Sequence, residues 1–520
     1  MNLNSPSIPN NSTYNLYLNS EIETKCLAES LGFYLNSNDL VTLSGELGVG
    51  KTTFARNLIR YLSGQPKLTI TSPTYLLVQE YDGVITKLIH ADLYRLTDPE
   101  ELTEIGFNES CENAITIIEW PERLPGLTEK ATVAIKFNLT DVTDVFSRDV
   151  SITADKDLLL SILDQYQIHK FLSGCDWIEA SRTLISGDAS GRRYERLTKD
   201  SASAVLMIVP QTKPEPILRN NLTYKKIAKL SVSLNTFVAA CNALLDQGFS
   251  APKILSYDIK NGLILTEDLG SDYIYNSAGP IIERYQEAVD FLTTLHGTNT
   301  PQEIPIYEGA FYQIPKYDTE ALLIEVELFI EWYIPNLTDY HLSIEARLSY
   351  LAIWKRLIEP RQAEPHGWTL RDFHSPNILW LNQRSGIKRV GLIDIQDMVW
   401  GHRAYDLASL LQDARINISP DLELDLFERY VRINAAKDPN FDVKAFTESY
   451  TIYALQRITK ILGIFVRLKL RDNKPEYYKL IPQLIGYLRR NISHPVLNEY
   501  REWLCMHCPA VLNDKSDEGC

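Results

Sequence analysis

"GELGVGKTTF", Gly45 to Phe54, is the stretch that decides the fold of the first part of the chain. It matches the pattern G-x-x-x-x-G-K-[ST], with a short apolar run before it and apolar residues at helical spacing after it. A strand, a glycine-rich loop and a helix in this order predict a phosphate-binding loop, because the loop N–H groups and the helix N-terminus attract phosphate oxygens. Lys51 is expected to reach the β- and γ-phosphates of ATP, and Thr52 to offer its hydroxyl to Mg²⁺. The residues predicted to bind the nucleotide are Gly45, Glu46, Gly48, Gly50, Lys51, Thr52 and Thr53.

Two carboxylates follow later strand-like runs. "TKLIHADLYRL" places Asp92 after an apolar run, and "AITIIEWPERL" ends an apolar run in Glu119. Acids at the carboxyl ends of parallel strands face the crevice where ligands bind in doubly wound sheets. Between the loop and Asp92, Ser72, Thr74 and Tyr75 lie in a polar turn of the kind that senses a γ-phosphate. The alternative for each acid alone is an exposed charge at a strand end.

The segments "GELGVGKTTF", "SPTYLLVQEY", "HADLYRL" and "IIEWPERLP", in this order and spacing, resemble the TsaE family over about the first 150 residues. The resemblance implies a small P-loop ATPase, with a mostly parallel sheet flanked by helices, that supports N6-threonylcarbamoyladenosine synthesis at position 37 of tRNA. It also implies TsaB and TsaD as protein partners, so that tRNA is met only through the complex. By the same resemblance Asp92 is a metal ligand, Glu119 is a catalytic acid beside Trp120 at the nucleotide site, and Thr74 belongs to a switch-like loop.

A change of pattern near residues 150–160 predicts a second domain. The polar segment "FNLTDVTDVFSRDVSITADKD" precedes "LLLSILDQYQIHKFL", which is expected to form a helix leading into that domain. The turn "GDASGRRY" follows, and Ser190, Arg192 and Arg193 are expected to donate to phosphate oxygens. On its own this motif is weak, and a plain hairpin turn is the alternative. "GLILTEDLG" ends in Glu267, Asp268 and Leu269 and is similar to the hinge between kinase lobes, where adenine meets backbone groups.

"RDFHSPNILWL" and "RVGLIDIQD" together supply the residue types that phosphoryl transfer needs. Asp372 is predicted to accept the proton of the attacking hydroxyl. Asn377 and Asp394 are predicted to hold Mg²⁺ between phosphate oxygens. An Asp followed by Asn five residues on, and then by an Asp after a strand, is more specific than either part alone.

These motifs, with "GLIDIQDMVWGHRAYDLASLLQDAR", resemble the aminoglycoside phosphotransferase-like kinases, and within them the AmgK group of anomeric N-acetylmuramate and N-acetylglucosamine kinases. The resemblance covers about 350 residues and implies that Asp397 is a second acid near the site, whereas Asp406 is expected to brace the loop. Two positions depart from the kinase pattern. Met207 stands where kinases carry a third-strand Lys. The AmgK group also lacks this Lys. Arg192 or Arg193 is the candidate for the missing positive charge. Leu370 stands in the place of the His of H-R-D.

Composition limits the remaining functions. The formal net charge of the 520 residues is −15, which does not favour direct binding of nucleic acid. The N-terminus lacks a signal-peptide pattern, and no apolar run is long enough for a membrane span. Scattered cysteines predict a reducing, cytoplasmic environment. Cys505 and Cys508 form a lone C-x-x-C, which is weak grounds for zinc. Trp332, Tyr333 and Trp368 are expected in the core rather than at a sugar.

The sequence therefore predicts an α/β P-loop NTPase domain over residues 1–155, followed by an α+β bilobal protein-kinase-like domain over residues 156–520. The expected function is bifunctional: a TsaE-type ATPase joined to an ATP- and Mg²⁺-dependent amino-sugar kinase. Alternatives for the second domain are an aminoglycoside- or choline-type kinase and a nucleotide-binding pseudokinase scaffold. Three questions stay open at this point: which sugar is preferred, whether the two domains are coupled, and the oligomeric state.

Overall fold

The computed structural model describes residues 11–139, 147–185, 191–210, 215–231, 233–307, 309–338 and 340–512 of the chain. Its contacts divide the chain into two compact units. The first unit comprises Met1–Arg182 with Leu197–Ala202, and the second comprises Thr183–Arg196 with Ser203–Cys520. Within the described residues, no helix is both long and apolar enough to span a membrane.

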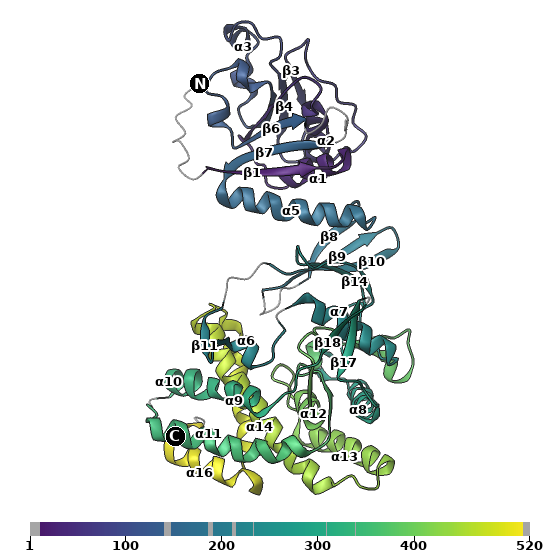
Figure 1. Cartoon of the computed structure of the whole chain (residues 1–520), viewed down its shortest axis with the longest axis vertical. Coiled ribbons are helices and arrows are strands. Elements are labelled where there is room, and N and C mark those ends of the chain that lie inside the picture. The colour runs from purple at the N-terminus through teal and green to yellow at the C-terminus, as the bar shows by residue number, and fades with distance from the viewer. Residues whose placement is uncertain are drawn as a thin grey trace. The chain divides into compact units, whose positions relative to one another are not determined.

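The first unit is built on a seven-stranded sheet in the order β1-β7-β6-β2-β5-β4-β3 (Figure 1). The four central strands are parallel, and both edges are closed by antiparallel pairs. The strands are β1 (Asn11–Leu18), β2 (Leu40–Ser44), β3 (Val78–Tyr81), β4 (Lys87–Asp92), β5 (Ala114–Glu119), β6 (Val133–Leu139) and β7 (Arg148–Asp155). The resemblance implied a mostly parallel sheet, and the parallel part is the centre that carries the nucleotide loop.

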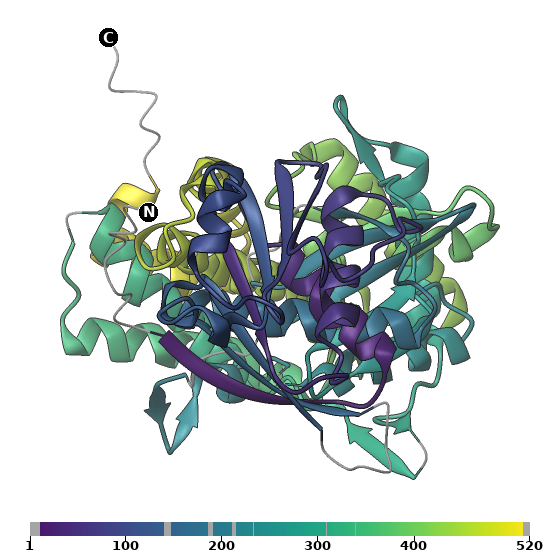
Figure 2. The ribbon, with the colours of Figure 1, turned by 90° about the horizontal axis from the view of Figure 1, so that it is seen from above.

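Helices cover both faces of this sheet, which is why its central strands are apolar on both sides. In β5, Ile115 and Ile117 join the core under α1 (Glu21–Gly32) and α2 (Lys51–Ser63). Ala114 and Ile118 join the core under α3 (Glu100–Glu104) and α4 (Phe107–Ser110). Figure 2 shows the purple helices α1 and α2 on one side of the strands. The strand, loop and helix predicted around Gly45 are thus β2, the turn after it and α2.

The helix predicted after residue 155 is α5 (Lys156–Gly174), which begins at an Asp155 cap. Its apolar residues Leu159, Ile162 and Tyr166 belong to the core of the first unit, and Figure 1 shows it running along β1. The sequence placed this helix at the entrance to the second domain, whereas its packing joins it to the first unit. The local sequence pattern predicted the helix but not the surface against which it packs. The boundary after residue 155 stays a prediction.

The second unit begins with a five-stranded sheet in the order β13-β14-β10-β9-β8, packed on α7 (Leu234–Asp246). Its strands are β8 (Ser181–Ile185), β9 (Arg193–Lys199), β10 (Ala202–Ile208), β13 (Ile254–Asp258) and β14 (Leu263–Glu267). Small elements connect this sheet to the helical part and decorate it: β11 (Ile217–Arg219), β12 (Leu222–Thr223), α6 (Tyr224–Ile227), β15 (Tyr275–Asn276), β16 (Gly279–Pro280), β17 (Glu303–Tyr307) and β18 (Ala310–Gln313).

The rest of the second unit is helical, and the long helix α14 (Val443–Leu470) is buried along most of its length. Around it lie α8 (Ile282–Gly297), α9 (Thr319–Leu328), α10 (Ile334–Leu337), α11 (Ile344–Ile358), α12 (Ala404–Leu411), α13 (Pro420–Lys437), α15 (Ile481–Asn491) and α16 (Asn498–His507). Two strand pairs carry the functional loops, β19 (His366–Thr369) with β22 (Val399–His402) and β20 (Ile378–Trp380) with β21 (Val390–Leu392).

The first unit is α/β, and the second combines a sheet-containing part with a helical part. Both agree with the fold class that the sequence predicts. Two of the three aromatic residues expected in the core are buried there, whereas Trp332 is only partly buried against it. Trp368 and Tyr333 are buried in the core, and the indole N–H of Trp368 donates to the Pro301 carbonyl at 2.8 Å. These two rings therefore contribute packing.

Candidate functional site

The phosphate-binding loop owes its shape to three glycines. Gly45, Gly48 and Gly50 have φ of +131°, +77° and +108°, a region that side-chain-bearing residues rarely adopt. A Cβ at Gly45 would also lie 2.3 Å from the Phe137 carbonyl oxygen. The loop leads into α2, whose first N–H groups receive no side-chain cap from Gly50. Uncapped N–H groups and a positive helix end are the donor set that a nucleotide phosphate requires.

Lys51 points back into this loop. Its ammonium donates to the carbonyl oxygens of Gly45 at 2.7 Å and Glu46 at 2.8 Å, and it lies 3.6 Å from the centre of the Trp120 ring. Desolvation lowers the pKa of this buried lysine. Trp120 has φ +61° directly after β5, which aims its ring at the loop. The sequence predicted that Lys51 and Trp120 share one site, and the structure brings them together.

Glu119 ends β5 and is held by two side chains. Thr52 donates its hydroxyl to Glu119 Oε2 at 2.8 Å, and His90 Nε2 lies 3.0 Å from Glu119 Oε1. Both Glu119 and His90 are buried. Sequence reasoning missed His90, although it stands in the quoted segment "HADLYRL" two residues before Asp92. Thr53 follows in the first turn of α2 and is half-buried.

Asp92 ends β4 and lies beside Glu119 in the parallel register. Its Oδ2 accepts hydrogen bonds from Ser72 and, at 2.8 Å, from Thr74. The Tyr94 N–H donates to its Oδ1 at 3.0 Å. The polar turn after α2 therefore contacts the acid that was predicted as a metal ligand, as a switch-like loop would. The carboxylates of Asp92 and Glu119 at the strand ends, with the Thr52 hydroxyl at the start of α2, offer the hard oxygen ligands that Mg²⁺ prefers.

Arg148, at the start of β7, reaches the outer side of the phosphate-binding loop. Its Nε donates to the Val49 carbonyl at 2.6 Å, and Nη1 donates to the Ser147 carbonyl at 2.6 Å. The donation fixes the loop immediately before Gly50. No sequence pattern predicts this contact, because Arg148 lies about 100 residues from the loop along the chain.

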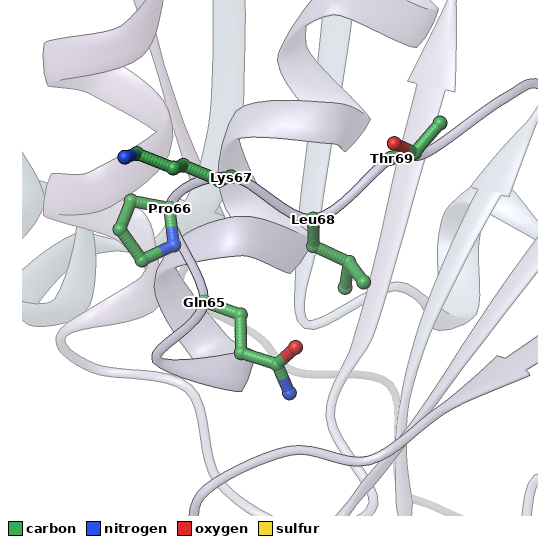
Figure 3. Close-up of a pocket in the computed structure, with 5 residues that line it drawn as sticks. All are labelled: Gln65, Pro66, Lys67, Leu68 and Thr69. Carbon is green, nitrogen blue, oxygen red and sulfur yellow. The ribbon is translucent and has the colours of Figure 1, made fainter.

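A shallow surface hollow lies at the other end of α2. It is lined by Gln65, Pro66, Lys67, Leu68 and Thr69, the turn that follows the helix (Figure 3). The 13 residues of α2 span about 20 Å at 1.5 Å each. The hollow is therefore remote from the nucleotide loop and does not belong to this site.

In the second unit, Asp372, Asn377 and Asp394 are linked through short loops. Asn377 Nδ2 donates to the Asp372 carbonyl at 3.1 Å, and the Ile393 N–H donates to the Asn377 carbonyl at 3.0 Å. Asp394 has φ +58°. The loop that carries Asp372 and Asn377 is thus joined to the segment before Asp394 by a backbone hydrogen bond. Their carboxylate and amide oxygens fit a divalent cation.

Arg192, directly before β9, contributes a cation to these acids. Arg192 Nη1 lies 3.0 Å from Asp394 Oδ1, and the side chains of both residues are mostly buried. Arg193 pairs instead with Glu195 at 3.1 Å. Ser190, predicted to donate to phosphate, lies outside the described residues. Of the two arginines weighed for the missing lysine charge, Arg192 is the one that contacts a site acid.

The predicted hinge lies at the end of β14. Glu267 is in an ion pair with Arg384 at 3.1 Å, and its N–H donates to the Lys253 carbonyl at 2.8 Å. Asp268 accepts two hydrogen bonds from Arg196, and although burial opposes the shift, this guanidinium lowers the pKa of Asp268. Leu269 follows and is half-buried. The carboxylates of Glu267 and Asp268 are therefore paired with arginines. Contacts to the adenine base would have to come from backbone groups of this segment.

Met207 lies on β10, the third strand from the start of the sheet, and is buried opposite Ile264 of β14. This strand consequently gives no cation at the position where kinases have lysine. Asp397, the predicted second acid, accepts a hydrogen bond from the Ser231 N–H at 2.6 Å.

Asp406 braces the catalytic loop, as the sequence predicted. It is fully buried near the start of α12 and accepts the N–H groups of Leu370 at 2.7 Å and Arg371 at 2.9 Å. Burial raises the pKa of Asp406 to about 7. The brace acts on the backbone, so it does not require the His that Leu370 replaces.

Comparisons with known proteins divide the chain in the same way. The family model described as "Threonylcarbamoyl adenosine biosynthesis protein TsaE" matches residues 18–149, and the one described as "Phosphotransferase enzyme family" matches residues 181–439. The domain boundary predicted after residue 155 lies between the two matches.

Three curated relatives cover these parts. The N-acetylmuramate/N-acetylglucosamine kinase of Caulobacter vibrioides is 35% identical over 351 residues, which are 65% of this chain and 95% of the relative. The kinase of that name from Neisseria meningitidis is 30% identical over 315 residues, 59% of this chain and 84% of the relative. The tRNA threonylcarbamoyladenosine biosynthesis protein TsaE of Rickettsia bellii is 41% identical over 124 residues, 24% of this chain and 85% of the relative.

Proposed function

The chain belongs to the TsaE family over its first unit and to the N-acetylmuramate/N-acetylglucosamine kinase family over its second, and from this premise we propose that it carries both activities. The first unit is an ATPase that supports threonylcarbamoyladenosine synthesis on tRNA. The second unit transfers the γ-phosphoryl group of ATP to the anomeric hydroxyl of N-acetylmuramate or N-acetylglucosamine. The linked arrangement of Asp372, Asn377 and Asp394 is the observation that carries the kinase proposal.

In the first unit, the loop from Gly45 to Thr53 holds the phosphates of ATP. Lys51 exchanges the carbonyls of Gly45 and Glu46 for phosphate oxygens, because its ammonium gains more from an anion than from two dipoles. Thr52 and Asp92 hold Mg²⁺, which neutralises phosphate charge when bound. Glu119, oriented by Thr52 and His90, accepts a proton from the water whose oxygen bonds to the γ-phosphorus, while the bond from that phosphorus to the β,γ-bridging oxygen breaks and ADP leaves.

The partners of the first unit are proteins of the TsaD and TsaB type. A net charge of −15 disfavours direct contact with tRNA, since phosphate binding needs clustered cations. Depleting this protein from a host without a second TsaE gene should lower the threonylcarbamoyladenosine content of tRNA, measured by mass spectrometry of nucleosides. Undiminished content would refute this half of the proposal.

In the second unit, Asp372 orients the anomeric hydroxyl and accepts its proton while the hydroxyl oxygen bonds to the γ-phosphorus. The bond from that phosphorus to the β,γ-bridging oxygen breaks, and ADP leaves. Asn377 and Asp394 hold Mg²⁺, which offsets the charge on the phosphates when bound. Ser190, Arg192 and Arg193 contact phosphate oxygens, with Arg192 in place of the absent lysine. These roles are supported by motif position and, for Arg192, by its contact with Asp394.

Adenine binding is assigned to the hinge. Glu267 would present its backbone C=O and Leu269 its backbone N–H to adenine, since the Glu267 N–H already donates to the Lys253 carbonyl and the acids of this segment pair with arginines.

The test of the kinase proposal is a substrate panel with the purified full chain, ATP and Mg²⁺. The panel contains N-acetylmuramate, N-acetylglucosamine, an aminoglycoside and choline, and products are read by ³¹P NMR, which distinguishes an anomeric phosphate. Asp372→Asn serves as the control for contaminating kinases. Turnover of the amino sugars alone is expected. Turnover of the aminoglycoside or choline instead would overturn the substrate assignment, and no turnover of any compound would favour the pseudokinase scaffold.

A further inference from the structure

Arg371, the residue before the predicted base Asp372, has an unusual backbone. Its φ is +66°, a left-handed conformation that residues with a side chain rarely adopt. The same turn carries a hydrogen bond from the Asp372 N–H to the Leu370 carbonyl at 2.8 Å. Changing φ at residue 371 would rotate the chain that follows and redirect the Asp372 carboxylate. An outlier at this position therefore points to a functional constraint.

The guanidinium of Arg371 enters the protein interior. It forms an ion pair with Glu325 of α9, and its Nη1 donates to the Ala228 carbonyl at 2.9 Å. It also lies 4.7 Å from the centre of the Tyr317 ring. The side chains of Arg371 and Glu325 are each only 1% exposed. A charge pair this deeply buried has well-defined geometry, because any departure leaves a charge without a partner.

Helix α14 completes the cluster around Glu325. Lys460 Nζ lies 3.2 Å from Glu325 and 3.1 Å from the Tyr405 hydroxyl. Gln456 Nε2 donates to Glu325 at 3.1 Å, and the Tyr317 hydroxyl donates to the same carboxylate. Glu325 is thereby fixed from α9, α14 and the segment before α9. It is a rigid anchor for Arg371.

The backbone of Arg371 is held by α12. Its N–H donates to Asp406, and its carbonyl accepts the Ser409 hydroxyl at 3.2 Å. Both partners lie on α12 and are fully buried. The N–H, the carbonyl and the side chain of this residue are all fixed by rigid helices.

We propose that Arg371 is a positioning residue: anchored in the buried cluster of Glu325, Lys460 and Tyr317, it holds the catalytic loop in a left-handed turn that aims Asp372. This rests on the proposed kinase function and deepens it, because it explains how the loop is set without the His that Leu370 replaces. The conformation is strained for a side-chain-bearing residue, and the anchor compensates for that strain.

Two substitutions at this position separate the anchor from the strain. Glycine adopts positive φ freely, so Arg371→Gly removes the anchor and the strain together. Arg371→Ala removes the anchor and keeps the strain, and its loop is expected to relax to negative φ. If the guanidinium acted on the substrate, both variants would lose that contact, and glycine would not restore kcat relative to alanine.

The kinetic experiment compares the full chain with Arg371→Gly, Arg371→Ala and Arg429→Ala. Arg429 pairs with Asp290 on the surface and is the matched control for removal of a paired arginine. We expect kcat for the amino sugar to fall at least tenfold in Arg371→Ala, with KM for ATP and sugar within threefold of wild type. We expect Arg371→Gly to stay within about threefold of wild type, and Arg429→Ala to be unchanged. Equal kcat in the glycine and alanine variants would overturn the proposal.

A second measurement does not need a substrate. Thermal unfolding of the second unit should occur at a higher temperature in Arg371→Gly than in Arg371→Ala, the reverse of the usual order. If wild-type protein phosphorylates no amino sugar, the proposed function fails and this comparison alone decides the inference. In that case an unfolding temperature of the glycine variant equal to or below that of the alanine variant would overturn it.

Discussion

Several charged side chains in the two sites are paired within the protein itself. Lys51 donates to loop carbonyls, Glu119 accepts from Thr52, and Arg192 pairs with Asp394. A buried charge without a partner is costly, so ligand binding at these sites exchanges partners and does not create the first ones. Each exchange keeps the side chain near its working position. His90 holds Glu119 in position, although His90 itself is not a candidate for contact with the ligand.

Replacing His90 tests this role. His90→Ala removes a hydrogen bond to a buried carboxylate, a contribution of about 1.5–3 kcal/mol. We expect kcat of ATP hydrolysis to fall about tenfold while the affinity for a fluorescent ADP analogue stays within twofold, because phosphates meet the loop rather than Glu119. His90→Gln keeps a donor and should lose less. The measurement is steady-state hydrolysis by the full chain without sugar, and an unchanged kcat in His90→Ala would contradict the role.

Glu364 gives a pH-dependent prediction. Burial alone would raise its pKa, but hydrogen bonds from His402 and Ser449, each 2.8 Å, outweigh burial and hold the pKa of Glu364 at about 2. The folded-state pKa lies below the unfolded value of 4.5, so this contribution to stability is complete above pH 4.5 and is lost as pH falls toward 2. Glu364→Gln should therefore unfold more easily than wild type at pH 7, and the difference should narrow below pH 4.5.

Urea unfolding of the second unit followed by tryptophan fluorescence, from pH 7 down to pH 3, measures that difference. Glu359→Gln is the control for loss of one carboxylate, since Glu359 is exposed in its pair with Lys355. A Glu364→Gln difference that stays constant over this range would show that the carboxylate contributes no pH-linked stability.

At the scale of elements, the sequence predicted what is local. The apolar run, the glycines and the helical spacing around Gly45 lie within 20 residues, and β2, the loop and α2 follow from them. The paired motifs at Asp372 and Asp394 were predicted for the same reason. Each is a short loop next to a strand, and its characteristic residues lie close together in the sequence.

The contacts that the sequence did not predict join distant segments. The surface covered by α5, the approach of Arg148 to Val49 and the pairing of Arg192 with Asp394 depend on how elements pack, which the composition of one element does not encode. Arg371 is a further case. Nothing in the sequence distinguishes Arg371 from other arginines. Only the structure shows that its backbone is in the left-handed conformation.

The packing of α14 against α9 depends on Gly463. A Cβ at this position would lie 2.3 Å from the Leu328 carbonyl oxygen at the end of α9, a contact with backbone that cannot move aside. Gly463→Ala should therefore destabilise the second unit by about 1–3 kcal/mol, although alanine favours a helix over glycine by about 1 kcal/mol. A Cβ at Gly486 in α15 would meet no described atom of another segment within 4 Å, so Gly486→Ala should stabilise instead. Urea unfolding compares the two, and equal effects would contradict the close approach.

At the scale of the whole molecule, two ATP-using sites of unrelated design occupy one chain. The first relies on a glycine loop and a helix N-terminus, and the second on a hinge and two acid-bearing loops. Every contact that we assign to one site comes from the unit that contains it. Two interpretations follow: the units work independently in one chain, or the nucleotide state of one regulates the other. The first requires no further element and is the one we favour.

Paired variants of the full chain distinguish these interpretations. Asp372→Asn keeps the size of the side chain and removes its charge, so the fold should survive. Sugar phosphorylation should fall by at least ~10², as expected for loss of a general base, and further if the hydroxyl is no longer oriented. ATP hydrolysis by the first unit should not change.

Lys51→Ala should give the reverse, with nucleotide binding at the first unit lost and sugar phosphorylation intact. Both activities are measured in each variant, with circular dichroism to check folding. If either substitution silences both activities in a folded protein, the two units are coupled, and independence is refuted.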